Sequence, residues 1–96
     1  MLTVENLREQ IQRAYNANLL EEIRFGSRTI TFKVVDNLYI TNQQFWFNDH
    51  KKIEKALKLE RHIRVNFPDV TKITHFIDKF GKIYFELEHT PHYTEL

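Results

Sequence analysis

The sequence contains no cysteine, and only two glycines and two prolines occur among its 96 residues. Without cysteine the chain cannot form a disulfide, present a thiolate nucleophile, or hold zinc or an iron–sulfur cluster through sulfur. Gly26 and Gly81 both fall in expected turns. Neither a phosphate-cradling loop nor a dinucleotide-binding fingerprint can therefore be built, and we expect no cofactor.

Long apolar runs are missing as well. No stretch approaches the roughly 20 apolar residues that a membrane-spanning helix needs. The first residues, MLTVENLREQIQ, carry charges and have no apolar segment of the kind found in signal peptides. Together with the lack of cysteine, these features predict a cytoplasmic protein with no membrane partner.

Few side chains are suited to catalysis. The only serine, Ser27, lies in an expected tight turn, which disfavours a serine triad. His75 falls on an apolar strand face, where a core histidine bonded to the backbone is the favoured interpretation over a general base. His89 and His92 are the only, weak, candidates for a metal site. We therefore expect no enzyme, no catalytic residues and no metal. The remaining alternative is an enzyme that uses His75 and the corner formed by Glu86, Glu88 and His89.

Hydrophobic periodicity predicts one α+β domain over residues 1–96, with the order α-β-β-β-α-β-β. The expected architecture is a two-layer sandwich, in which an antiparallel sheet carries both helices on one face. The expected elements are a helix over 1–19 with Thr3 as N-cap, a three-stranded meander over 20–47, a basic helix over 48–67, a hairpin over 70–89 and a tail over 90–96.

Three tight turns are expected to set the strand register. A two-residue Gly26-Ser27 loop would pair Ile23 with Ile30. A loop over 35–37 would then place Leu38 opposite Val34, so that a third strand joins the sheet. In the last hairpin, Gly81 takes a left-handed conformation, and the pairs run from Asp78/Lys82 through Ile77/Ile83, Phe76/Tyr84, His75/Phe85, Thr74/Glu86 and Ile73/Leu87 to Lys72/Glu88.

The second helix is expected to be amphipathic, with Asn48 or Asp49 as its cap and Pro68 just beyond its end. Its expected apolar stripe consists of Ile53, Ala56, Leu57, Ile63 and Phe67. The opposite stripe is basic, and residues 50–64 carry six Lys or Arg against two Asp or Glu, although the whole chain has a net charge of only +1. The candidates for binding a polyanion are Lys51, Lys52, Lys55, Lys58 and Arg61.

The α-β-β-β-α order, with paired lysines at the start of the second helix, resembles the double-stranded RNA-binding domain over residues 3–66. The resemblance implies that Lys51 and Lys52 contact phosphates. The glycines that this family usually shows before its lysine pair are absent, and NQQFWFND stands in their place.

The aromatic run in NQQFWFNDHKK follows a change of phase in the apolar pattern across TNQQ. Either the strand bulges there, or it ends near Thr41 and the run belongs to a connection. In an extended segment Trp46 must point away from Phe45 and Phe47. One side of the run is therefore expected to be buried in the core, while the other is left exposed to pack against another group. Core packing, a partner interface and base stacking all remain open, and the interface candidates are Phe45, Trp46, Phe47 and Phe80.

These features predict a small non-catalytic binding or regulatory protein that acts through a protein–protein interface. The partner is expected to be another protein, a second copy of the chain included. Inhibitors of host machinery encoded by phages or mobile elements are one class of this size. The alternative is an RNA- or DNA-binding domain that uses the basic helix over 50–64.

Overall fold

The structure is a computed structural model, and it describes residues 2–91. Its elements are α1 (Val4–Asn16), β1 (Leu20–Phe25), β2 (Thr29–Val34), β3 (Asn37–Ile40), β4 (Gln43–Trp46), α2 (Lys52–Asn66), β5 (Val70–Ile77) and β6 (Ile83–His89). The α+β class is confirmed, although the described chain has one strand more than predicted. The expected tail lies outside the described residues from position 92 onward.

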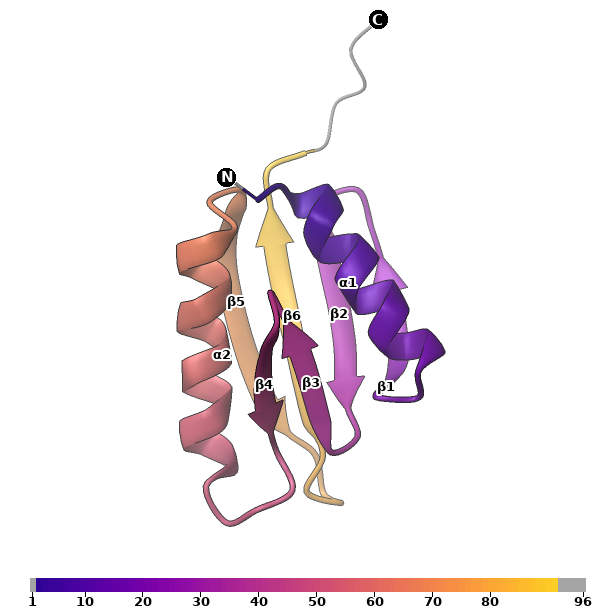
Figure 1. Cartoon of the computed structure of the whole chain (residues 1–96), viewed down its shortest axis with the longest axis vertical. Helices are drawn as coiled ribbons and strands as arrows, with labels where there is room; N and C mark the ends of the chain where they lie inside the picture. The colour runs from indigo at the N-terminus through magenta and orange to yellow at the C-terminus, as the bar shows by residue number, and fades with distance from the viewer. Residues whose placement is uncertain (1, 92–96) are drawn as a thin grey trace, which may run out of the picture.

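The strands form two separate sheets. A four-stranded antiparallel sheet has the order β1-β2-β6-β5, and β3 pairs only with β4. Both helices and the β3–β4 hairpin lie on one face of the larger sheet, with the hairpin between the helices (Figure 1). The two-layer arrangement is as predicted, while the opposite sheet face is left open by the described elements.

The larger sheet is built from two similar units. In each unit a helix is followed by an antiparallel strand pair, α1-β1-β2 and α2-β5-β6, and the helix contacts the outer strand of its own unit. The inner strands β2 and β6 pair antiparallel at the centre, from Thr29 opposite Glu88 to Val34 opposite Ile83. The units are therefore related by an approximate two-fold axis through the sheet, and the hairpin is inserted between them.

The core fills the space between the sheet and the covering layer. Alternate residues of β2 and β6 point inward, and the rings of Phe32 and Phe85 stack with their centroids 5.3 Å apart. The helices contribute Leu7, Ile11, Ala56, Leu59 and Ile63, all fully buried. Thr3 is the N-cap of α1 as predicted, and its side chain forms a reciprocal capping pair with Asn6.

The predicted register between β1 and β2 is wrong. Phe25, not Ile23, pairs with Ile30, because the loop is longer and closes with the Gly26 N–H bonded to the Thr29 carbonyl at 2.8 Å. A β-bulge follows, with Glu22 at a φ of 51°. Without the bulge, the alternation of side chains would place Glu21 opposite Val34, on the buried face. The extra residue shifts the register, so that Glu21 pairs with Lys33 on the open face and Leu20 enters the core.

The predicted meander over 20–47 and its loop over 35–37 are also wrong. The chain does turn between β2 and β3, but β3 enters the other layer without pairing with β2 (Figure 1). The hairpin forms at Thr41 and Asn42 instead, with φ of 49° and 65°, which is the geometry of a two-residue hairpin turn. This turn explains the change of phase across TNQQ. The alternative in which the strand ends near Thr41 is therefore correct, although a β-branched threonine rarely adopts a positive φ and does not by itself indicate a turn.

Both helices hold this turn in place. The Gln10 side chain of α1 accepts a hydrogen bond from the Thr41 N–H at 2.7 Å. From α2, His62 Nε2 contacts the Thr41 hydroxyl and lies 3.1 Å from the Ile40 carbonyl oxygen. The turn conformation is therefore fixed by contacts that are remote in sequence.

The last hairpin has the predicted register in full, from Ile77 opposite Ile83 to Lys72 opposite Glu88. Gly81 has a φ of 81°, as its turn position requires. The cap of α2 differs from the prediction, because Lys51 occupies the N-cap and makes no side-chain capping bond. Asp49 instead accepts a hydrogen bond from the Lys51 N–H before the helix begins.

The open face of the sheet carries a charge cluster around Lys33. Its ammonium lies 3.6 Å from Glu21 and 3.7 Å from Asp78, and the Tyr84 hydroxyl donates to Glu22 at 2.6 Å. Desolvation alone would raise the pKa of Asp78, but the backbone N–H groups of Lys82 and Phe80, together with Lys33, outweigh it and lower this pKa. The cluster thus connects β1, β2 and β6 to the β5–β6 turn.

Gln10→Ala should destabilise the protein by about 1 kcal/mol, because it removes the acceptor of the Thr41 N–H. Gln12→Ala is the matched control, since Gln12 is exposed and bonds only to Asn16 within α1. Urea denaturation measures both variants. Equal stability of the two would show that Gln10 does not hold the turn.

Asp78→Asn should reduce the free energy of unfolding at neutral pH. The folded-state pKa of Asp78 is lowered, so its contribution is present above the unfolded value of roughly 3.9 and is lost as the pH falls through the folded value. The difference between wild type and variant should therefore stay constant above about pH 5 and close in more acidic solution. Denaturation at a series of pH values tests this, and a difference that persists at the acid end would contradict it.

Candidate functional site

The aromatic run divides between the core and the surface. Phe45 and Phe47 are 2% and 3% exposed, whereas Trp46 is 46% exposed. The Phe45 ring packs on His62, and the Phe47 ring meets Phe85 edge-on. Phe45 and Phe47 are therefore core residues that no partner can reach in this conformation, while Trp46 and Phe80 stay at the surface.

The five basic candidates of α2 are only partly grouped on one flank of the helix. The Lys52 ammonium donates to the Gly81 carbonyl at 2.8 Å and is committed to the fold. Helical spacing places Lys51, Lys55 and Lys58 on the flank that carries His62 and faces the hairpin, and Arg61 toward the other flank. The order that resembled the double-stranded RNA-binding domain is not retained, because β3 leaves the sheet to pair with a fourth strand.

The predicted apolar stripe of α2 is rotated in the structure. The buried residues of the helix are Ala56, Leu59, Glu60 and Ile63. Ile53 and Leu57, expected inside, are 58% and 53% exposed. Hydrophobic patterning does not predict a buried glutamate such as Glu60, and it therefore placed the stripe wrongly. The rotation leaves two large apolar side chains on the surface.

Glu60 is tolerated inside because it has a partner. Its carboxylate bonds to Nδ1 of His75, which projects from β5 toward α2. The predicted backbone partner of His75 is therefore replaced by a carboxylate from the helix. A buried carboxylate needs such a hydrogen-bonded partner, so this pair fixes how α2 lies on β5.

His89 is not available to a metal ion. Its Nδ1 lies 2.6 Å from the Thr90 carbonyl oxygen, and its Nε2 lies 3.0 Å from the Arg8 guanidinium. His92, the other weak candidate, lies outside the described residues. Within residues 2–91 no three His, Asp or Glu side chains come together as metal ligands would.

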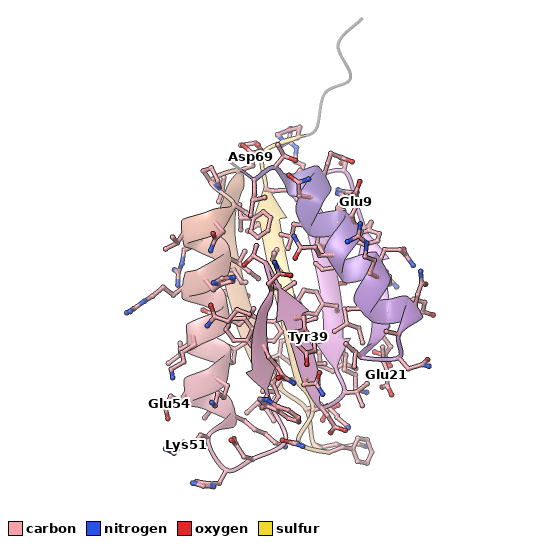
Figure 2. All side chains as sticks on the ribbon, viewed as in Figure 1. Glu9, Glu21, Tyr39, Lys51, Glu54 and Asp69 are labelled. Carbon is pink, nitrogen blue, oxygen red and sulfur yellow. The ribbon has the colours of Figure 1, made fainter. Side chains whose placement is uncertain are left out.

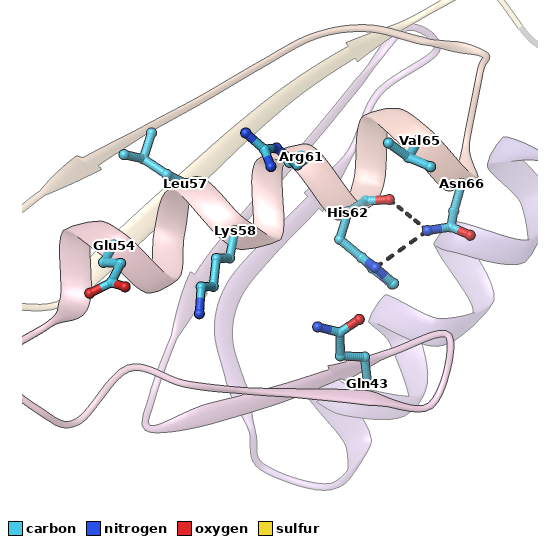
Figure 3. Close-up of a pocket in the computed structure, with 8 residues that line it drawn as sticks. All are labelled: Gln43, Glu54, Leu57, Lys58, Arg61, His62, Val65 and Asn66. Carbon is cyan, nitrogen blue, oxygen red and sulfur yellow. Dashed lines mark hydrogen bonds between the residues drawn. The ribbon is translucent and has the colours of Figure 1, made fainter.

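A groove of about 590 Å³ follows α2 beside the hairpin. Figure 3 shows Lys58 and His62 turned toward Gln43 of β4, whereas Leu57 and Arg61, which also line the groove, project from the other side of the helix. The Asn66 amide donates to the His62 carbonyl at 2.8 Å, so the polar groups at this end serve the fold. The groove lacks a set of convergent catalytic groups, and its lining mixes apolar and charged residues.

Within the described chain, the larger sheet has two outer strands with an unpaired edge, β1 and β5, and α2 lies beside the β5 edge. β5 is an outer strand, and no described element continues the sheet beyond it. Asp78 donates its N–H to the Lys82 carbonyl at 2.9 Å, and antiparallel pairing alternates from that bond. The backbone groups of Ile73, His75 and Ile77 therefore point away from β6, toward open space.

The flank of α2 above this edge is apolar. Helical spacing places Ile53, Leu57 and Arg64 on the side away from the hairpin, and Ile53 lines a common hollow with Ile77 of β5. Figure 2 shows Glu54 on this side of the helix as well. We call the outward backbone of Ile73, His75 and Ile77, with the side chains of Ile53, Glu54, Leu57, Arg61 and Arg64, the edge-and-flank surface.

Sequence reasoning missed this surface for two reasons. Strand order decides which strand is at the edge, and order depends on contacts far apart in the chain. The exposed position of Leu57 depends on the Glu60–His75 pair.

Comparison with known proteins adds no function, because no family model, curated protein or solved structure matches the chain significantly. Within the part of the chain that the structure describes, neither helix has the length and apolar character needed to cross a membrane.

Replacement of Leu57 by alanine should change the stability of the isolated protein by less than about 0.5 kcal/mol, because the side chain is exposed. Leu59→Ala is the matched control on the same helix and should cost about 2–5 kcal/mol, since Leu59 is fully buried. Urea denaturation of both variants distinguishes the two orientations of α2. If α2 had the orientation expected from the sequence, Leu57→Ala would lower the stability more than Leu59→Ala.

Proposed function

We propose that this chain is a non-catalytic binding protein that acts through a protein–protein interface at the edge-and-flank surface. The observation that carries the proposal is an unpaired strand edge lying beside exposed apolar side chains of the neighbouring helix. An unpaired strand edge or an exposed apolar side chain is common by itself. Here the two lie side by side, so that one partner strand could bond to the edge while its side chains cover the apolar residues of α2.

The unpaired backbone groups of β5 supply the first part of the interface. An exposed strand edge is a template for another extended chain, whose main-chain groups complete the hydrogen bonds. Lys72 is the only charged residue in β5, and the strand contains no proline. β5 therefore lacks most of the features that prevent edge pairing.

The α2 flank supplies the second part. Ile53 and Leu57 offer a small apolar centre, while Arg61 and Arg64 lie around it and remain exposed. An apolar centre with a charged rim is the usual composition of a protein interface, and arginine is enriched there.

The nucleic-acid alternative has less support. A polyanion interface needs a continuous basic surface, whereas Lys51, Lys55 and Lys58 form only a short stripe on the hairpin flank of α2. Arg61 lies toward the other flank, and Lys52 is bonded to Gly81. A cytoplasmic location also belongs to this proposal and is supported by the lack of cysteine. A role as an inhibitor of host machinery is supported by size alone.

The test is retention of proteins from a nuclease-treated lysate of the source cells on the immobilised chain. Proteins held by the wild type should be lost with Leu57→Glu, because the charge cannot be desolvated at an apolar centre. Tyr15→Glu is the matched control, since Tyr15 is a large exposed residue of α1 at 44% exposure, remote from β5.

Equal retention by Leu57→Glu and Tyr15→Glu would contradict the proposed surface. Retention from an untreated lysate that is lost from the nuclease-treated one would support nucleic-acid binding instead.

A further inference from the structure

We propose that the partner at the edge-and-flank surface is a second copy of this chain, joined by antiparallel pairing of β5 with β5 about a two-fold axis at His75. This inference rests on the proposed function and names its partner. The product would be a dimer with one continuous eight-stranded sheet, since each copy contributes the four strands of its larger sheet.

The backbone restricts the register. Only Ile73, His75 and Ile77 direct their hydrogen-bonding groups outward, so residues that exchange bonds across the axis must come from this set. With His75 opposite its own counterpart, Ile73 of each copy lies opposite Ile77 of the other. Apolar side chains then face each other on the inner side of the joined sheet.

The same register is also complementary in charge. It places Lys72 of each copy opposite Asp78 of the other, so opposite charges meet at both ends of the paired segment. Centring the pair on Thr74 would put Lys72 opposite Phe76 instead. Centring it on Ile73 would put Ile77 opposite Asp69 and leave an apolar side chain against a carboxylate.

The helices fit this arrangement. Glu60 of α2 bonds to His75, so the axis passes near the middle of the helix, and Leu57 lies one turn away. The two-fold axis runs the two α2 helices antiparallel, which brings Glu54 of one copy toward Arg61 and Arg64 of the other. The exposed leucines lie near the axis, and opposite charges lie on both sides of it.

The other sheet edge favours a closed dimer over an open chain. β1 carries the bulge at Glu22, and bulges twist an edge away from further pairing. An isologous β5–β5 contact uses the same surface on both copies, so association stops at two.

The experiment combines sedimentation with a charge-swap pair. The wild type should sediment as a dimer, while Leu57→Glu alone and Leu57→Lys alone should each associate at least about tenfold more weakly through like-charge repulsion near the axis. An equimolar mixture of the two variants should recover a dimer, because opposite charges then meet. Tyr15→Glu should behave as the wild type.

Backbone pairing is read separately by amide hydrogen exchange at several protein concentrations. The amides of Ile73, His75 and Ile77 should become protected as concentration rises, whereas those of Thr74 and Phe76, which bond to β6, should be protected throughout.

A wild type that stays monomeric up to about 1 mM would overturn the proposal. A dimer without concentration-dependent protection at Ile73, His75 and Ile77 would overturn it too. If the wild type is monomeric but retains lysate proteins that Leu57→Glu does not retain, the proposed function holds and only the dimer is wrong. Failure of the dimer can therefore be told apart from failure of the proposed function.

Discussion

The turn at Thr41 and Asn42 is the constraint on which the rest of the architecture depends. Because the chain reverses there, β3 pairs with β4 and leaves the free edge of β2 to β6. The conformation is unfavourable for threonine, and it persists because Gln10 of α1 and His62 of α2 both bond to the turn. One short hairpin thus fills the gap between the helices and permits the two α-β-β units to join.

The Glu60–His75 pair has a comparable effect on the surface. It brings a charged side chain into the inner stripe of α2 and so turns Ile53 and Leu57 outward. A buried carboxylate contributes little net stability compared with an apolar residue of similar volume. Its effect here is on orientation, since the pair fixes which flank of α2 lies above the β5 edge.

Local patterns predicted those parts of the fold whose causes are local. At the last hairpin, the glycine turn, the apolar alternation and the charge pairs favour one register, and the whole register was correct. Alternation likewise separated Trp46 from Phe45 and Phe47. The change of phase across TNQQ left an end of the strand near Thr41 as one of two alternatives. Neither the turn conformation nor the rotation of α2 could be predicted, because Gln10, His62 and His75 act on residues far from them in the sequence. The open β5 edge follows from strand order, which no local pattern determines.

The two edges of the larger sheet, β1 and β5, differ in how well they could pair with another strand. At β1 the bulge serves the core, because it places Leu20 inside and Glu21 outside, and it also makes the edge a poor template. At β5 an irregularity lies at the start of the strand, between Val70 and Lys72, but the pairing from Lys72 to Ile77 is regular. The free edge of this regular part lies beneath exposed isoleucine and leucine side chains, a combination that favours uncontrolled association. The proposed β5–β5 dimer would remove this difference between the edges, because pairing would cover the open edge and the apolar side chains above it.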